Sequence, residues 1–173
     1  MNNQEKYKYA FALTSVASTG ICFIEDSLAR IMNDSTDCAF LRSFYILLSY
    51  NFELILKSRI VMLSSVAGKE ALNDELRKLG HDLIKIKEAL GSNLEELGIK
   101  EVIENDGRYE ITNTAEEKIY IENFTRIRYD FLDDVTRKVD NQEHLRIKQY
   151  AEIMNSVLVQ TKRKNETTKN QIS

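Results

Sequence analysis

The stretch from Phe40 to Ser65 constrains the fold most, because it is apolar on almost every side of a helix. A helix of this kind must be buried over most of its surface. At 100° per residue, its polar exceptions share a stripe about 60–80° wide, made of Arg42, Ser49, Glu53 and Lys57. Such a stripe reaches solvent, is closed by internal ion pairs, or lines a polar groove that other segments complete.

The chain has 173 residues, with no proline and only six glycines. Proline breaks helices, so its absence favours long ones. The length suits one domain with a sizeable core. The sequence therefore predicts a single all-α domain over residues 1–163, an antiparallel up-and-down bundle of four to five main helices. We expect the polar segment 164–173 to be a disordered tail.

Apolar residues at three- and four-residue steps indicate the individual helices. The first spans 4–32 and is rich in small residues, which let a neighbouring helix cross closely at Gly20. We expect four others: a central helix to about residue 66, two shorter ones ending at Gly80 and Gly91, and a last one over 141–162.

Residues 99–113 break the helical pattern. Asp106-Gly107 is typical of a tight turn and lies between two short apolar runs, so a short β-hairpin insertion is predicted near 99–113. After it, Asn113 or Thr114 is expected to cap a further helix whose apolar positions are Ile119, Ile121, Phe124 and Ile127.

Charge and targeting signals exclude some functions. The net charge is −3, so the surface as a whole does not attract nucleic acid, although a local basic groove is compatible with it. The N-terminus does not resemble a signal peptide, and polar residues interrupt the apolar run at 44–56, so we expect a cytoplasmic protein without a membrane span. Cys22 and Cys38 lack metal-ligand spacing and suggest buried free thiols. No cofactor and no metal is expected.

Three clusters are candidates for function. Glu53 and Lys57 are four residues apart in the favourable order for an ion pair. His81 stands at an expected helix start, as a cap, a packing residue or a catalyst. The third cluster consists of two arginines on alternate residues and a neighbouring tyrosine: Arg126, Arg128 and Tyr129. Such a cluster suits phosphate binding and base stacking. Alternatively, Arg128 pairs with Glu53 in the core.

These clusters, in this order, resemble the motifs of the HEPN superfamily of small helical bundles. The matching segments are Glu53-Leu54-Ile55-Leu56-Lys57, then Gly80-His81-Asp82-Leu83, then Arg128-Tyr129. The resemblance covers roughly residues 40–160. In many relatives a proline follows the Arg-Tyr pair, whereas Asp130 follows it here.

The resemblance implies an antiparallel helical bundle, frequently a homodimer, that binds a nucleotide or RNA. Many members work beside a nucleotidyltransferase partner in toxin–antitoxin pairs, and we extend this setting to defence systems in general. The implied groove combines five residues. Lys57 and Arg128 would face phosphate, Tyr129 would stack on a base, Glu53 would orient a cation, and His81 would complete the site.

Other members are metal-independent ribonucleases with an arginine, four to six residues, and a histidine. Arg137 and His144 have this spacing. The arginine would polarise the phosphate, and the histidine would act as acid or base on the 2′-OH. The two lie on one helical face if the helix covers Arg137. Lys138 stands where active members usually have Asn, Asp or His.

Three functions therefore stay open. The first is a non-catalytic or weakly active HEPN-like protein that binds a nucleotide or RNA. The second is a ribonuclease that uses Arg137 and His144. The third is a non-catalytic protein-interaction bundle, in which the charged stripe is only an ion-pair network. The acidic composition favours the third over broad nucleic-acid binding, since phosphate contacts need concentrated positive charge.

Overall fold

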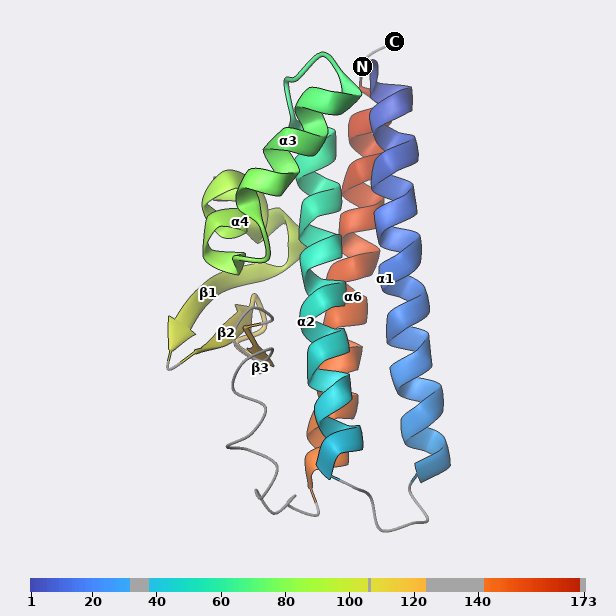
Figure 1. The fold of residues 1–173 in the computed structure, drawn as a ribbon, viewed down its shortest axis with the longest axis vertical. Helices are drawn as coiled ribbons and strands as arrows, with labels where there is room; N and C mark the ends of the chain where they lie inside the picture. Colours follow the sequence, from blue (N-terminus) through green and yellow to red (C-terminus); the bar gives the residue numbers. More distant parts are fainter. Residues whose placement is uncertain (32–37, 106, 124–141, 172–173) are drawn as a thin grey trace.

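The computed structural model describes residues 1–31, 38–105, 107–123 and 142–171. Three long helices lie side by side along its length (Figure 1): α1 (Asn3–Ile31), α2 (Cys38–Leu63) and α6 (Glu143–Asn170). α1 is antiparallel to α6, since Asn3 contacts Thr168. α2 and α6 are parallel, since Tyr45 contacts Glu143 and Arg59 contacts Thr168. Both chain ends therefore lie at the same end of the molecule.

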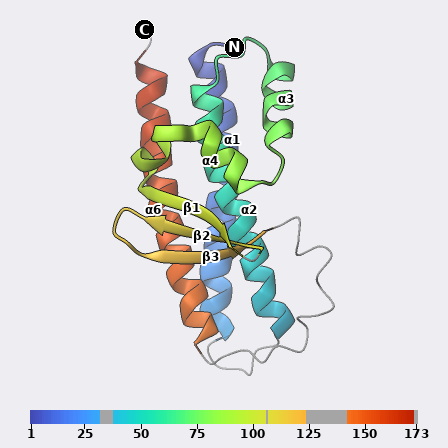
Figure 2. The same cartoon turned by 90° about the vertical axis from the view of Figure 1, so that its left-hand side faces the viewer.

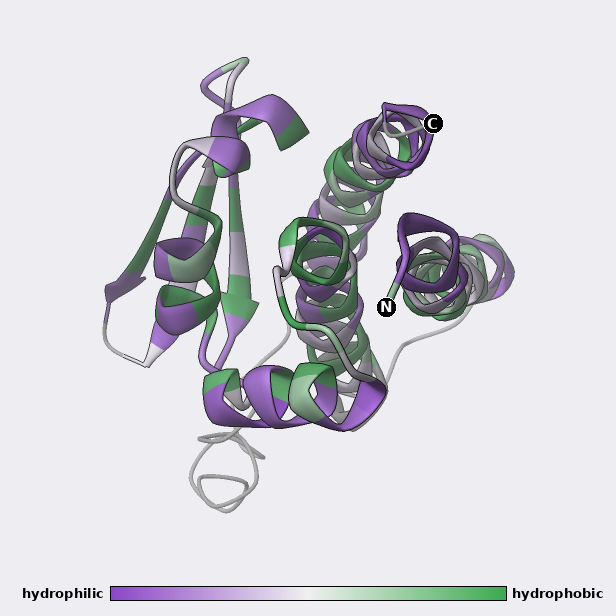
Figure 3. Cartoon of the chain, turned by 90° about the horizontal axis from the view of Figure 1, so that it is seen from above, coloured by the Kyte–Doolittle hydropathy of each residue, from purple (hydrophilic) through white to green (hydrophobic). Residues whose placement is uncertain are grey.

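Shorter elements cover one side of these helices. α3 (Lys69–Leu79), α4 (Leu83–Leu90) and the 3-10 helix η1 (Gly91–Leu97) lead into an antiparallel sheet of order β1-β2-β3. Its strands are Ile99–Asn105, Arg108–Asn113 and Lys118–Glu122, and they lie across α2 and α6 (Figure 2). Viewed from above, the sheet and α4 lie on one side and α1 on the other (Figure 3).

The mostly helical fold is confirmed, and α2 is its centre. α2 contacts α1, α6, α4 and β3, so its apolar residues are buried in several directions. Phe44, Leu48, Phe52 and Ile55 are fully buried. This enclosure explains why the stretch is apolar almost all the way round.

The predicted hairpin is confirmed, but the helix predicted after it is wrong where the structure describes that segment, up to residue 123. Residues 118–122 form β3, a third strand paired with β2. Ile119 and Ile121 are buried and alternate with exposed residues, a period of two that fits a strand. The Asn113 carboxamide accepts hydrogen bonds from the Ala115 and Glu117 N–H groups, so it forms a turn and caps no helix. Phe124 and Ile127 lie outside the described residues.

The prediction of a disordered tail at residues 164–173 is also wrong for most of that segment, because α6 continues to Asn170. Asn165 is buried and donates to Ser58 Oγ over 3.2 Å. Thr168 Oγ1 accepts from Arg59 Nη1 over 2.7 Å. Two of the polar side chains that suggested disorder are instead used in hydrogen bonds to α2, which composition alone does not indicate.

The close helix crossing predicted at Gly20 is confirmed. A Cβ atom added there would lie 2.4 Å from the side chain of Asn51 on α2, well inside van der Waals contact. Asn51 is itself almost completely buried. Cys22, about half a turn away, is exposed, so the prediction of a buried thiol is wrong at this position.

α2 carries charged residues within its apolar sequence, at Glu53, Lys57 and Arg59. Within the ranges that the structure describes, no helix is long and apolar enough to cross a membrane. This finding agrees with the expectation drawn from the interrupted run at 44–56.

Candidate functional site

The polar stripe of α2 faces the segments inserted between α2 and α6. Ser49 Oγ donates to the backbone oxygen of Glu122, at the end of β3, over 2.7 Å. One turn further along, Glu53 and Lys57 face the link between α3 and α4. The side chain of Arg42 lies outside the described part of the chain. The stripe is therefore covered by chain from two directions.

Glu53, Lys57 and His81 form a cluster of short contacts. Lys57 Nζ lies 2.7 Å from Glu53 Oε1, and it also donates to the backbone oxygen of Gly80 over 2.6 Å. His81 Nδ1 lies 2.8 Å from the other carboxylate oxygen, Oε2. The first two HEPN-like motifs thus meet in space. Arg128, which the sequence offered as an alternative partner of Glu53, lies outside the described residues.

Burial differs sharply across this cluster. Glu53 is 4% exposed and the side chain of Lys57 is 12% exposed, whereas the side chain of His81 is 46% exposed. The carboxylate and the ammonium therefore form the inner part, and the imidazole forms the outer edge. Glu53 and Lys57 hold each other, so His81 is the member of the cluster best placed to meet a ligand.

Local backbone features orient His81. α3 ends at Gly80, which has a φ of 58°, a conformation that glycine adopts without strain. Asp82 then caps α4, accepting from the N–H groups of Ile84 at 2.9 Å and Lys85 at 3.3 Å. His81 is thus fixed between a helix end and a helix start. The carboxylate of Asp82 also occupies the α4 N-terminus, where an external anion would otherwise bind.

Tyr109 of β2 adds a hydroxyl beside the cluster, and the sequence analysis missed it. Its hydroxyl accepts a hydrogen bond from Asn123 Nδ2 over 3.0 Å. Burial is the main cause that raises the pKa of Tyr109 to about 12. A hydrogen bond with the Leu83 backbone lowers this pKa, and the negative charges of Asp82, Glu104 and Glu53 raise it further. The Leu83 backbone follows Asp82, so the hydroxyl lies near the start of α4.

The arrangement suits recognition or proton transfer at His81. The imidazole of His81 is about half exposed, so a ligand at the outer edge of the cluster can approach the ring. A buried carboxylate that orients an imidazole in this way recurs in acid–base sites. Lys57 does not suit direct phosphate binding, because Glu53 and the Gly80 carbonyl already hold its ammonium group.

His144 lies apart from this cluster. It is in the first turn of α6, and its neighbour Glu143 accepts a hydrogen bond from the hydroxyl of Tyr45. Tyr45 precedes Glu53 by eight residues of α2, about 12 Å along the helix axis. Arg128, Tyr129 and Arg137 lie outside the described residues.

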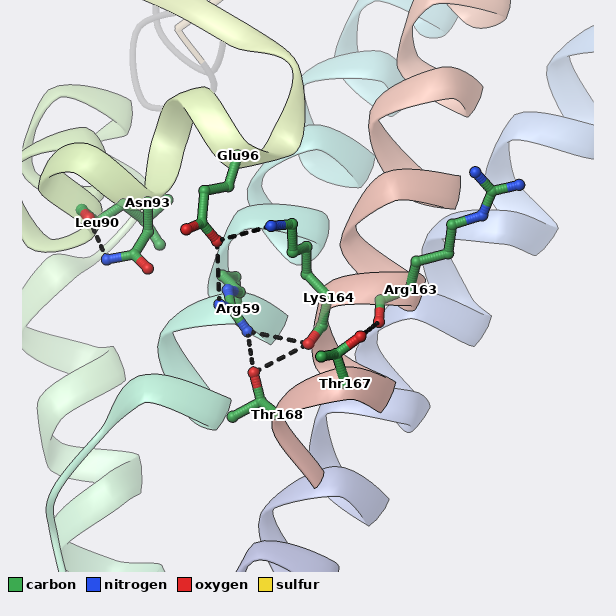
Figure 4. A network of polar contacts seen from close by, with 8 residues as sticks. All are labelled: Arg59, Leu90, Asn93, Glu96, Arg163, Lys164, Thr167 and Thr168. Carbon is green, nitrogen blue, oxygen red and sulfur yellow. Dashed lines mark hydrogen bonds and ion pairs between the residues drawn. The ribbon is translucent and has the colours of Figure 1, made fainter. Parts of the chain in front are cut away.

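Arg59, half a turn beyond Lys57, belongs to a second polar network (Figure 4). Its guanidinium donates to Thr168 Oγ1 over 2.7 Å and to the Lys164 carbonyl over 3.3 Å. Glu96 of η1 lies 3.5 Å from Arg59 Nη2 and 3.3 Å from Lys164 Nζ. Burial lowers the pKa of Arg59. This network joins α2, η1 and the end of α6, which is a structural role.

A shallow polar pocket lies elsewhere, between the start of β1, the β2–β3 turn and α6. Its lining includes Asn113, Glu117, Glu152 and Gln160. The Asn113 side chain is already used within its own turn, and none of the motif residues reaches the pocket. The His81 cluster is therefore the better candidate site.

Comparison of the chain with protein-family models, with curated proteins and with solved structures finds no match. The likeness to the HEPN superfamily therefore depends on the three motifs. Of these, the structure describes the first two and brings their charged residues into contact.

Proposed function

We propose that this chain is a HEPN-like up-and-down helical bundle that binds a nucleotide or an RNA at the outer edge of the Glu53–Lys57–His81 cluster. The observation that supports this function most directly is the 2.8 Å contact between His81 Nδ1 and Glu53 Oε2. These residues are 28 positions apart and come from the two motifs that carry the resemblance. An ion-pair network serving stability alone has no need of an exposed imidazole.

The roles of the residues differ from those that the sequence suggested. In this proposal Glu53 orients an imidazole instead of a cation, and Lys57 fixes the α3–α4 link through Gly80. His81 contacts a phosphate oxygen or a ribose hydroxyl. Arg128 and Tyr129 keep their proposed roles in phosphate binding and base stacking. They follow Asn123 by five and six residues, and Asn123 contacts Tyr109 beside the cluster.

The charge balance restricts the ligand to a small one. The net charge is −3, so the protein lacks the broad positive surface that a long nucleic acid needs. We therefore expect recognition of a mononucleotide, or of one or two nucleotides within an RNA, with a weak dependence of affinity on salt. The family resemblance would place such a protein beside a nucleotidyltransferase or an antitoxin, and co-purification of the two chains would test that setting.

The test is a metal-free binding titration with a mononucleotide set and a short unstructured RNA. His81→Ala should weaken binding at least tenfold, because it removes the most exposed member of the cluster. His144→Ala is the matched control, since it removes the other histidine of the chain and should leave affinity unchanged. Absence of binding in the unmodified protein, or equal affinity in His81→Ala, would refute the proposal and leave the protein-interaction bundle.

A metal-independent ribonuclease is the second candidate, and the carboxylate-oriented imidazole of His81 favours it. In that case His81 would exchange a proton with the 2′-OH or with the leaving 5′-oxygen. RNA cleavage in the presence of a chelator would separate the sites. Loss of cleavage in His81→Ala alone supports this site. Loss in His144→Ala alone supports the Arg137–His144 pair.

A further inference from the structure

The polar pocket beside α6 is separate from the His81 cluster, since none of the cluster residues lines it. Its volume is about 350 Å³, near the lower end of the range for sites that bind small ligands. One wall is the turn between β2 and β3, which lies beside α6 (Figure 2), and another wall is a face of α6. The pocket is therefore large enough for a small molecule or for one long side chain.

α6 contributes a row of polar side chains and an apolar floor to this pocket. The polar residues follow one another at steps of three or four, so they lie on one face of the helix. They are Gln149, Glu152, Ser156 and Gln160. Ile153 and Val157 also line the pocket and are buried. A ligand with both a polar group and an aliphatic part suits such a lining.

The polar side chains of α6 are available to a ligand. Those of Gln149, Ser156 and Gln160 make no hydrogen bond within the part of the chain that the structure describes. Glu152 lies 3.9 Å from Lys148 Nζ, and both side chains are about 60% exposed, so this pair is weak. A ligand in the pocket can therefore bind these groups without breaking strong contacts inside the protein.

Two close contacts hold other parts of the lining in place. The Asn113 carboxamide accepts hydrogen bonds from the N–H groups of Ala115 and Glu117, and it donates to Glu117 Oε2 over 2.7 Å. At the start of β1, a Cβ atom added to Gly98 would lie 2.8 Å from Gln160 Nε2. The Gln160 carboxamide therefore lies in space that the missing side chain of Gly98 leaves free. The carboxylate of Glu117 and the carboxamide of Gln160 are thus positioned before a ligand arrives.

The lining determines the charge of the ligand. As far as the structure describes it, the lining has two carboxylates, from Glu117 and Glu152, and no basic or aromatic residue. A phosphate or a carboxylate would meet like charge there, and a nucleobase or a sugar would find no ring on which to stack. The pocket therefore favours a cation without an aromatic ring.

We propose that this pocket binds an aliphatic ammonium group, either that of a small free amine or that of a lysine side chain. The ammonium group donates hydrogen bonds to the oxygens of Glu117, Glu152 and Gln160. The methylene groups of the ligand pack on Ile153 and Val157. This site does not depend on nucleotide binding at His81, so either of the two can fail without the other.

An amide NMR titration of the full chain with butylamine at neutral pH and constant ionic strength tests the pocket. The signals of Gly98, Ala115 and Ser156 should shift and saturate, with a Kd on the order of millimolar for so small a ligand. Butanol and butyrate have the same aliphatic chain without the positive charge, and they should bind at least about tenfold more weakly. Absence of a saturable shift with butylamine, or equal affinity for butanol, would overturn the proposal.

Two variants and a second ligand sharpen this test. Glu152→Gln should weaken butylamine binding at least about tenfold, because it removes a charged acceptor. Glu166→Gln, at an exposed position of α6 outside the pocket, is the matched control and should leave affinity unchanged. Unchanged affinity in Glu152→Gln would overturn the proposal.

Lysine with both its α-amino and its carboxyl group capped as amides distinguishes the two sources of the ammonium group. If it binds as tightly as butylamine, the pocket accepts a lysine side chain of a partner protein. If butylamine binds and the capped lysine does not, the ligand is a small free amine. Either result supports an ammonium site and identifies which kind of ligand it takes.

Discussion

Replacement of Lys57 by methionine tests whether the inner part of the Glu53–Lys57–His81 cluster behaves as a buried ion pair. The substitution keeps chain length and helix propensity. It removes the 2.7 Å contact with Glu53 and the 2.6 Å hydrogen bond to Gly80. The carboxylate of Glu53, which is 4% exposed, then loses its charged partner.

The expected cost follows from this burial. Breaking a buried pair by removing one partner costs about 3–5 kcal/mol. The half-exposed His81 side chain still contacts the carboxylate and lets water approach, so we expect about 2–4 kcal/mol here. For a chain of this size that is a fall in Tm of about 5–15 °C. Adding Glu53→Gln should recover about 1–2 kcal/mol, because it removes the uncompensated charge.

The assay is chemical denaturation at neutral pH, with the free energy of unfolding compared between variants. Lys148→Met is the matched control. Lys148 pairs with Glu152 at the same four-residue spacing, but both side chains are about 60% exposed, so the loss should stay below about 1 kcal/mol. A cost for Lys57→Met as small as that of Lys148→Met would show that the cluster is effectively solvated and would refute the reasoning.

Other predictions concern packing, the end of α6 and pH. Gly20→Ala should lower the free energy of unfolding by about 1–2 kcal/mol in denaturation experiments, since overpacking against Asn51 outweighs the gain in helix propensity. Gly68→Ala is the control, because the space around Gly68 is open, and it should change the free energy of unfolding by less than about 1 kcal/mol. Removal of residues 164–173 should cost at least about 2 kcal/mol by the same measurement, because Arg59 loses the Lys164 carbonyl and Thr168 Oγ1 as acceptors and keeps only Glu96. The raised pKa of Tyr109 favours its neutral form in the folded state, so this part of stability is complete below pH 10 and is lost between about pH 10 and 12. Tyr109→Phe should reduce the alkaline loss of stability in pH-resolved thermal melts without abolishing it, because the pKa values of Tyr45 and Tyr150 are raised as well.

Strong local patterns made much of the fold predictable from the sequence. The apolar stretch at residues 40–65 predicted that α2 is buried, and Gly80 and Gly91 predicted where α3 and α4 end. The Asp-Gly dipeptide gave the β1–β2 hairpin. Each of these signals is local, because it depends on helix period, chain termination or turn chemistry within a few residues.

The errors arose where tertiary contacts decide the outcome. Residues 118–122 were predicted as part of a helix, and pairing with β2 makes them a strand. The end of α6 is polar in composition, yet Asn165 and Thr168 are held by α2. In the candidate site, Glu53, Lys57 and His81 were found through motif order. Tyr109 was missed because its place beside the cluster depends on how the sheet lies against α2.

The central claim is that His81 is the ligand-facing group of a site oriented by Glu53. The chain has only two histidines, so ¹⁵N NMR of the imidazole side chains resolves both of them in one spectrum. Titration with a mononucleotide or a short RNA should shift the His81 nitrogens and leave those of His144 unchanged. Unchanged His81 signals at ligand concentrations that alter other parts of the spectrum would contradict the account.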